Sequence, residues 1–190
     1  MARRKDHTRE ELLELAVRTG RELVAAEGTE ALTARNVAKL MGYAPGTLYN
    51  LFENIDGLVA EINARTLEDF ADGIDRILRK YGKPRKRMEK ICAAYLKLQE
   101  RQPHLWTLCF ATPLKARTEA YHRAVHRVFD PVTEALLPLS GGRQSARRDA
   151  KILWSTLHGI CLLRKSGKFE VGGSDPAEVL VERFLDRFLQ

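Results

Sequence analysis

The sequence contains only three cysteines, Cys92, Cys109 and Cys161, which are far apart and lie in apolar segments. An odd number at this spacing supplies neither a disulfide framework nor the clustered ligands of a structural zinc site. The three residues are therefore predicted to be buried, reduced thiols. Such cysteine usage favours a reducing, cytoplasmic location.

A long apolar run is also missing. The N-terminal stretch MARRKDHTREELLE has no apolar segment of signal-peptide length, and no segment approaches the roughly 20 apolar residues that cross a bilayer. A soluble protein without a membrane partner is expected.

The alternation of β-branched and polar residues that marks strands is absent, as are internal repeats and low-complexity tracts. Apolar residues instead recur at helical spacing over nearly the whole chain of 190 residues. The sequence therefore predicts an all-α fold, built as one large domain or as a small module joined to a larger one.

The charge is unbalanced towards positive. Lys and Arg number 32 against 25 Asp and Glu, which gives a net charge of +7 and a pI near 9.5. This excess favours a polyanionic partner such as nucleic acid or an anionic membrane face, although net charge alone identifies neither.

The N-terminal third contains signals for short helices. Thr8 and Glu11 form a capping-box pattern at the start of a first helix, and Gly28 is placed to end it. Thr33 can cap a second, short helix, which Gly42 would end as a left-handed turn residue. A small helical module is therefore predicted here.

The stretch MGYAPGTLYNLF, residues 41–52, predicts a third short helix. Leu48, Leu51 and Phe52 fall on one face, which leaves a small polar face made of Pro45, Gly46, Thr47, Tyr49 and Asn50. Two short helices joined by a tight turn are typical of a helix-turn-helix, whose second helix enters the major groove of DNA.

Further helices are expected after this module. A long one begins near Asn54 or Asp56 and ends before YGKPRKR, so it can connect two modules. In a later helix, Gly159 predicts the close approach of another helix. Asp175 is expected to cap the last helix, with Pro176 in its first turn.

The segment TARNVAKLMGYAPGTLYNLFENIDGLVAEI resembles the DNA-binding module of the tetracycline-repressor (TetR) family of bacterial transcription regulators. The shared pattern is Thr, Val-Ala, Gly, Gly-Thr-Leu-Tyr, Phe and a downstream Leu, and the resemblance covers about residues 8–62. Farther on, LWSTLHGI resembles the Trp-His-Gly signature of one C-terminal domain type in that family.

This resemblance implies a non-enzymatic, homodimeric repressor without a cofactor, which binds double-stranded DNA at a pseudo-palindromic operator and is released by a small effector. Residues 1–53 would form the helix-turn-helix domain. Residues 54–190 would form the ligand-binding and dimerisation domain, with the dimer interface on the last two long helices.

The resemblance also assigns roles within the DNA-binding module. Candidate base-edge contacts are Arg35, Gly46, Thr47 and Asn50. Candidate phosphate or backbone contacts are Thr33, Pro45 and Tyr49.

Three positions depart from the family pattern. Ala44 replaces the usual Ser cap of the recognition helix, Leu51 replaces a His or Tyr, and Ile55 replaces a Lys. The sequence therefore predicts a recognition helix that is held by packing and contacts fewer phosphates than is usual for the family.

Four aromatic residues of the C-terminal part, with one Cys and one His, could together line an apolar pocket, although an ordinary core position is the better interpretation of each one taken singly. The six candidates for contact with a mostly apolar effector are Trp106, Cys109, Phe110, Tyr121, Trp154 and His158.

Other chemistry has less support. His122 and His126 stand four residues apart with Glu119 on the same face, but nothing completes a metal site, and no metal is predicted. No nucleophile, base and orienting group can be assembled from the spacing. The alternative to a ligand-responsive repressor is a protein of the same fold that binds DNA non-specifically or binds only a protein partner.

Overall fold

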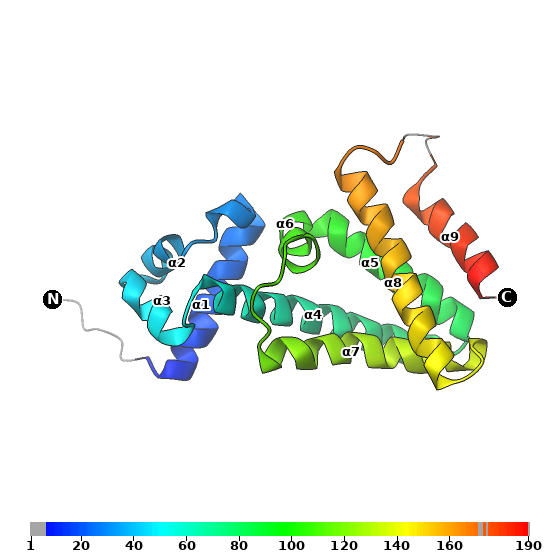
Figure 1. Cartoon of the computed structure of the whole chain (residues 1–190), viewed down its shortest axis with the longest axis horizontal. Helices are drawn as coiled ribbons and strands as arrows, with labels where there is room; N and C mark the ends of the chain where they lie inside the picture. The colour runs from blue at the N-terminus through cyan, green and yellow to red at the C-terminus, as the bar shows by residue number, and fades with distance from the viewer. Residues whose placement is uncertain (1–6, 171–172, 174, 190) are drawn as a thin grey trace. The chain divides into compact units, whose positions relative to one another are not determined.

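The computed structural model describes residues 7–170, 173 and 175–189. Across these residues the chain forms helices joined by turns and loops, and they contain no strand (Figure 1). The predicted all-α fold is confirmed. The first three helices are α1 (Arg9–Glu27), α2 (Ala34–Met41) and α3 (Pro45–Leu51).

The remaining helices follow the predicted order, although α5 begins earlier than its apolar pattern indicated. They are α4 (Ile55–Lys80), α5 (Pro84–Arg101), α6 (Pro103–Trp106) with a π-helical turn (Thr107–Ala111), α7 (Glu119–Leu136), α8 (Arg143–Lys165) and α9 (Ala177–Phe188).

The described chain packs as two compact units. The N-terminal unit comprises the residues up to Thr66 together with Gln102–Arg123, and the C-terminal unit comprises Leu67–Arg101 and the residues from Ala124 onwards. Helices α4 and α7 contribute residues to both. The boundary expected between Glu53 and Asn54 falls inside the N-terminal unit. The division into a DNA-binding part and a ligand-binding part at this point stays a prediction.

The predicted caps of α1 are confirmed. The Thr8 hydroxyl accepts from the Glu11 N–H at 3.2 Å, and the Thr8 N–H donates to the Glu11 carboxylate at 2.8 Å. The two bonds satisfy the backbone N–H groups of Thr8 and Glu11, which have no carbonyl partner within the helix. Gly28 ends the helix with φ 90°.

One apolar core holds the N-terminal unit together. It joins α1, α2, α3 and the first turns of α4 to the segment around α6, through Ala16, Val17, Leu23, Val24, Leu32, Val37, Ala38, Leu48, Phe52, Leu58, Ile62, Leu105 and Leu108. Leu105 and Leu108 come from α6 and the π-helical turn after it, and their partners in the N-terminal core lie far away in sequence.

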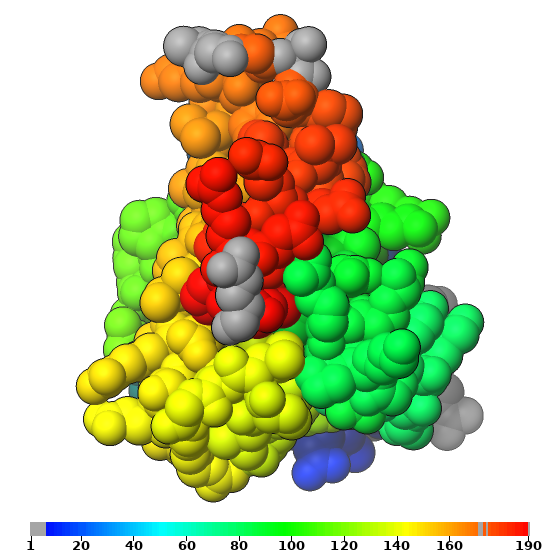
Figure 2. Space-filling view, turned by 90° about the vertical axis from the view of Figure 1, so that its right-hand side faces the viewer, coloured from blue at the N-terminus to red at the C-terminus, as the bar shows by residue number. Residues whose placement is uncertain are grey.

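The C-terminal unit is built from α5, α8 and α9 with the adjoining parts of α4 and α7. Figure 2 shows α9 lying between α5 and α8 on one face of this unit. The buried positions of α9, Ala177, Val181 and Leu185, recur at helical spacing. Arg164 ties α8 to α5 through Gln99 and through Glu100, whose carboxylate is 2.7 Å away.

All three cysteines are free and buried, as predicted. Burial raises the pKa of the Cys92 and Cys109 thiols to about 12 and that of Cys161 to about 11. At neutral pH they are protonated and therefore weak nucleophiles. In the part of the chain that the structure covers, no helix combines the length and apolarity needed to cross a membrane.

One local prediction was wrong and another is not met within the chain. At the start of α9, Pro176 and not Asp175 occupies the cap position, and no side chain bonds to the helix end there. No other part of the described chain comes within 4 Å of a Cβ built on Gly159, so the predicted approach of another helix does not occur inside the subunit and stays a prediction for a partner.

Candidate DNA interface and effector cleft

The turn between α2 and α3 is fixed by backbone hydrogen bonds. Gly42 adopts φ 79° and ψ 26°, the left-handed conformation that a residue with a Cβ rarely adopts. Its N–H donates to the Lys39 carbonyl at 3.2 Å, while the Tyr43 N–H donates to the Ala38 carbonyl at 2.9 Å. This pair of bonds closes α2 and turns the chain towards α3.

The N-terminal end of α3 has no side-chain cap. Ala44 occupies the cap position, and the first turn is closed by the Thr47 N–H bonding to the Ala44 carbonyl at 2.9 Å. Pro45 at the first helical position has no N–H to satisfy and its φ is already suited to a helix. The predicted absence of a cap is confirmed.

Replacing Ala44 with serine is expected to stabilise the protein, because Ala44 already has the extended backbone of a cap residue, with φ −76° and ψ 148°. A serine hydroxyl there can accept from a first-turn N–H and contribute about 1 kcal/mol, which corresponds to a rise in Tm of roughly 2 to 4 °C. Denaturant unfolding measures this. Ala26→Ser, at an exposed position inside α1, is the control and should lower stability slightly; equal effects of both variants would contradict the capping argument.

The inner face of α3 is apolar. Leu48 is only 3% exposed and Phe52 8%, and both belong to the N-terminal core. Leu51 and Ile55 are partly buried and pack against the same core. Packing by Leu48 and Leu51 of α3, and by Phe52 and Ile55 just beyond its end, offsets the low intrinsic stability of so short a helix.

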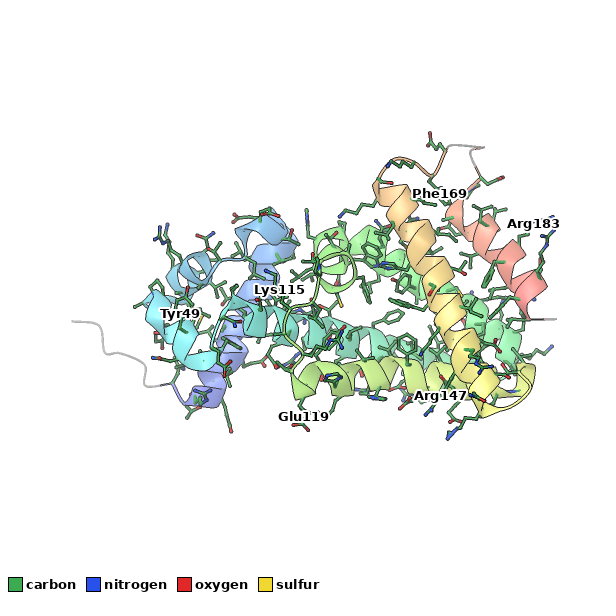
Figure 3. All side chains as sticks on the ribbon, in the orientation of Figure 1. Tyr49, Lys115, Glu119, Arg147, Phe169 and Arg183 are labelled. Atoms are coloured by element: carbon green, nitrogen blue, oxygen red, sulfur yellow. The ribbon has the colours of Figure 1, made fainter. Side chains whose placement is uncertain are left out.

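The outer face of α3 is small and polar. Pro45, Gly46 and Asn50 are exposed, Tyr49 is 55% exposed and Thr47 is partly buried. Figure 3 marks Tyr49 on this helix. No neighbouring atom of the described residues lies within 4 Å of a Cβ built on Gly46. Packing inside the described chain therefore does not require a glycine there, and an external surface has room to approach.

The two candidates on α2 are exposed as well. Thr33 caps the helix by accepting from the Asn36 N–H at 3.2 Å, and its hydroxyl proton remains available to donate to a phosphate. Arg35 lies in the first turn of α2 and is exposed. The seven candidate DNA contacts thus all lie on α2 and α3 or at the start of α2.

Arg9 makes a further contact with the end of α3, and this contact was not predicted. Its guanidinium donates to the carbonyl of Asn50 at 3.0 Å and to that of Leu51 at 3.3 Å. Arg9 lies 41 residues before Asn50 and 42 before Leu51, and no local sequence pattern indicates a contact over such a distance.

The C-terminal unit contains an apolar cleft. About 370 Å³ within it is not filled by atoms, part of that space being open to solvent, and its walls are Phe70, Ile91, Tyr95, Val128, Phe129, Val132, Ala150, Leu153, Trp154 and Leu157. Only about 40 Å³ of this space is wide enough to admit a water molecule, so the cleft offers an apolar surface to part of a ligand.

A polar pair stands beside this cleft. The Tyr95 hydroxyl and His158 Nδ1 are 3.2 Å apart, and the His158 ring stacks on Trp154 with centroids 5.4 Å apart. Burial lowers the pKa of His158 and so favours the neutral ring, which can both donate and accept. Of the six candidate ligand contacts, the structure brings Trp154 and His158 together here.

The other four candidates belong to the N-terminal unit. Trp106 is completely buried and its ring lies 5.8 Å from that of Phe110. The Cys109 thiol lies 3.9 Å from the Asn63 carbonyl oxygen. Tyr121 is partly buried, and burial is the main cause of its raised pKa.

The histidines of α7 are both exposed. His126 lies 3.4 Å from the Asp130 carboxylate, and His122 contacts the ring of Tyr121. Among the residues that the structure describes, no group of three or more His, Cys, Asp or Glu side chains is placed to hold a metal ion.

Two family models match the sequence. Residues 16–62 match the family described as bacterial regulatory proteins, tetR family, and residues 88–188, more than half of the chain, match the tetracyclin repressor-like C-terminal domain. The first match spans the helix-turn-helix, and the second spans α8 and α9.

Individual proteins give a consistent picture. An uncharacterised helix-turn-helix-type transcriptional regulator of Mycobacterium tuberculosis is 25% identical over 144 residues, which are 74% of this chain and 64% of that protein. A protein of unknown function from Rhodococcus superposes with a TM-score of 0.74 at 19% identity, over 100% of this chain and 97% of the other.

A third similar protein is the transcriptional regulator FadR of Bacillus subtilis, solved in complex with stearoyl-CoA. It superposes with a TM-score of 0.64 at 13% identity, over 93% of this chain and 97% of the other. At this identity the likeness concerns the fold.

The helix-turn-helix geometry of α2 and α3 and the matches to both family models lead to one assignment. The chain belongs to the TetR family of bacterial transcriptional regulators.

Proposed function

We propose that the protein is a dimeric, ligand-responsive repressor that binds a pseudo-palindromic operator and releases it when a small, mostly apolar effector binds. Residues 1–53 would bind DNA, and residues 54–190 would bind the effector and form the dimer. The observation that carries the proposal is the division of α3 into a buried apolar face and an exposed, small, polar one.

The outer face of α3 fits the major groove. Gly46 lets the helix backbone approach, and Asn50 and Thr47 can bond base edges, for which side-chain amides and hydroxyls are suited. Tyr49, Pro45 and Thr33 would lie against the phosphate backbone, and Arg35 would contact a base edge from α2. These assignments come from the family pattern combined with exposure.

Replacing Ile55 with lysine is expected to steepen the salt dependence of operator binding. Ile55 packs against the core where the family favours Lys, and each added phosphate contact raises the slope of log K against log salt by about 0.9 per half-site. Titrations at several salt concentrations measure this, with Ala111→Lys, outside the first three helices, as the control for added charge. An unchanged slope in Ile55→Lys would show that this position does not reach the phosphates.

The proposed dimer interface includes one face of α8. Ile152, Leu162 and Leu163 are exposed large apolar residues, 38 to 47% accessible, and they share this face with Ser155 and Gly159 at helical spacing. The open space above Gly159 gives a partner helix room to approach closely. Apolar surface at this density on a helix favours a protein interface.

The apolar cleft of the C-terminal unit is the proposed effector site. Trp154 and Phe129 would contact the apolar part of the effector, and the pair of Tyr95 and His158 would bond its polar group. The complex of Bacillus subtilis FadR with stearoyl-CoA is an example of a similar fold that holds a ligand with a long apolar part. The effector can weaken operator binding only by the factor by which it binds the DNA-free conformer more tightly than the DNA-bound one.

Selection of bound sequences from a random duplex pool tests the proposal. Enrichment of a two-fold symmetric sequence, with half-sites one helical turn or a multiple apart, is the expected result. Binding without enrichment would instead favour the alternative of a protein that binds DNA non-specifically, and absence of binding would favour a protein-partner role.

A further inference from the structure

We infer that Arg9 is a positioning residue for DNA recognition. Its guanidinium fastens the C-terminal end of α3, so that the outer face of this helix is presented to the bases in one orientation. The inference rests on the proposed role of α3 and adds to it a residue outside the helix-turn-helix.

Helix α3 needs outside support at both ends. It has seven residues, far fewer than the roughly 12 to 15 that an isolated helix needs for even marginal stability in water. Its N-terminal end has no side-chain cap. Gly46 inside it adds backbone freedom that the helix must lose on folding.

The C-terminal end of α3 is interrupted abruptly. Phe52 has φ −133°, which is not helical, and Glu53 has the positive φ of 29°. Since the helix stops there, the last carbonyls of α3 cannot all be satisfied by N–H groups farther along the chain. The Leu48 carbonyl does receive the Phe52 N–H at 2.9 Å, but those of Asn50 and Leu51 face the guanidinium of Arg9.

Arg9 matches this end in both shape and charge. The two guanidinium nitrogens Nη1 and Nη2 reach two successive carbonyls, at 3.0 and 3.3 Å, which a single ammonium group cannot do with the same geometry. The positive charge also lies at the negative end of the helix dipole, where cations are favourable.

The support comes from a firmly held helix. Arg9 is the first residue of α1, and the capping box between Thr8 and Glu11 fixes the backbone on either side of it. Farther along, Ala16 and Val17 bury α1 in the N-terminal core. Arg9 therefore links the C-terminal end of the short helix α3 to a longer helix that is fixed both by a capping box and by the core.

An exposed arginine beside α3 could equally serve as a phosphate contact, and the two roles predict different behaviour. A phosphate contact strengthens binding to every sequence alike and contributes to the salt slope. A positioning contact affects the specific site, where base edges must be met in register, and leaves the salt slope unchanged. Lysine preserves a phosphate contact but cannot bridge two carbonyls in the same way.

The test compares Arg9→Ala, Arg9→Lys and the control Arg18→Ala, an exposed arginine on the same helix. Affinity is measured at several salt concentrations for a duplex selected from a random pool and for a random-sequence duplex. We expect Arg9→Ala to lose about tenfold on the selected duplex, as the loss of two charge-assisted bonds on an exposed surface suggests, with less than about twofold change on the random one. Arg9→Lys should fall in between, and the control should match the wild type.

Equal losses on both duplexes, with a slope reduced by about 0.9 per half-site and restored by lysine, would overturn the inference and make Arg9 a phosphate contact. Unchanged affinity in Arg9→Ala would also overturn it. Amide hydrogen exchange of α3 in DNA-free protein gives a separate reading, because Arg9→Ala should speed exchange there and Arg18→Ala should not. If the wild type shows no preference for any duplex, the proposed function fails. In that case, faster exchange in Arg9→Ala still supports the fastening of α3, and unchanged exchange refutes it.

Discussion

Replacing Leu163 with arginine is expected to convert the protein to a monomer and to lower its affinity for a symmetric operator by about a hundredfold or more, since linked half-sites commonly gain that much over single ones. Leu163 is 47% exposed in the single chain, so the substitution leaves the core of the subunit intact. In the proposed dimer it would place a charge against the apolar face formed with Ile152 and Leu162, where an unpaired charge is unfavourable.

Sedimentation equilibrium and operator titration measure the two parts of this prediction. His122→Arg is the matched control, because it adds the same side chain at an exposed site on α7. It should remain dimeric and bind as the wild type does. A Leu163→Arg protein that stays dimeric would show that this face of α8 is not the interface, and a monomer with full operator affinity would refute two-site binding.

Replacing Gly46 with leucine should separate stability from DNA binding. In the free protein no atom lies within 4 Å of a Cβ at this position, and the glycine does not adopt a positive φ. Leucine should therefore stabilise α3 by up to about 1 kcal/mol through helix propensity. On the proposed DNA face, however, the same side chain occupies the space through which the backbone approaches the bases.

We expect Gly46→Leu to raise the denaturation midpoint while weakening operator binding by about thirtyfold, equivalent to about 2 kcal/mol. Gly82→Leu is the control, because a Cβ at Gly82 also meets no atom within 4 Å, but Gly82 lies in the loop between α4 and α5. Its operator affinity should be unchanged. If Gly46→Leu binds the operator as tightly as the wild type, the outer face of α3 around Gly46 does not meet DNA.

The local features of the fold could be predicted because each depends on neighbours in sequence. The Thr8 capping box, the left-handed Gly42 and the uncapped start of α3 at Ala44 all follow from residues within a few positions. The packing of Leu51 followed from its helical spacing with Leu48. Ile55 packs as expected, but it does so from the first turn of α4, because α3 ends at Leu51.

What could not be predicted depends on contacts between distant segments. Arg9 reaches carbonyls 41 and 42 residues away, and Leu105 enters a core formed mainly by α1 to α4. The sequence around Gly159 also does not tell whether an approaching helix would belong to the same chain or to a partner, and within the described chain none comes near. Backbone acceptors such as the Asn50 carbonyl carry no sequence signal at all.

Recognition of a symmetric operator by the two α3 helices of a dimer is the central element of the proposed function, and one titration tests it directly. The wild type is titrated with three duplexes: the selected symmetric sequence, the same sequence with one half-site scrambled, and a fully scrambled one. We predict binding of the symmetric duplex about a thousandfold tighter than of the fully scrambled one, with the half-scrambled duplex in between. Equal affinity for all three duplexes would contradict the account.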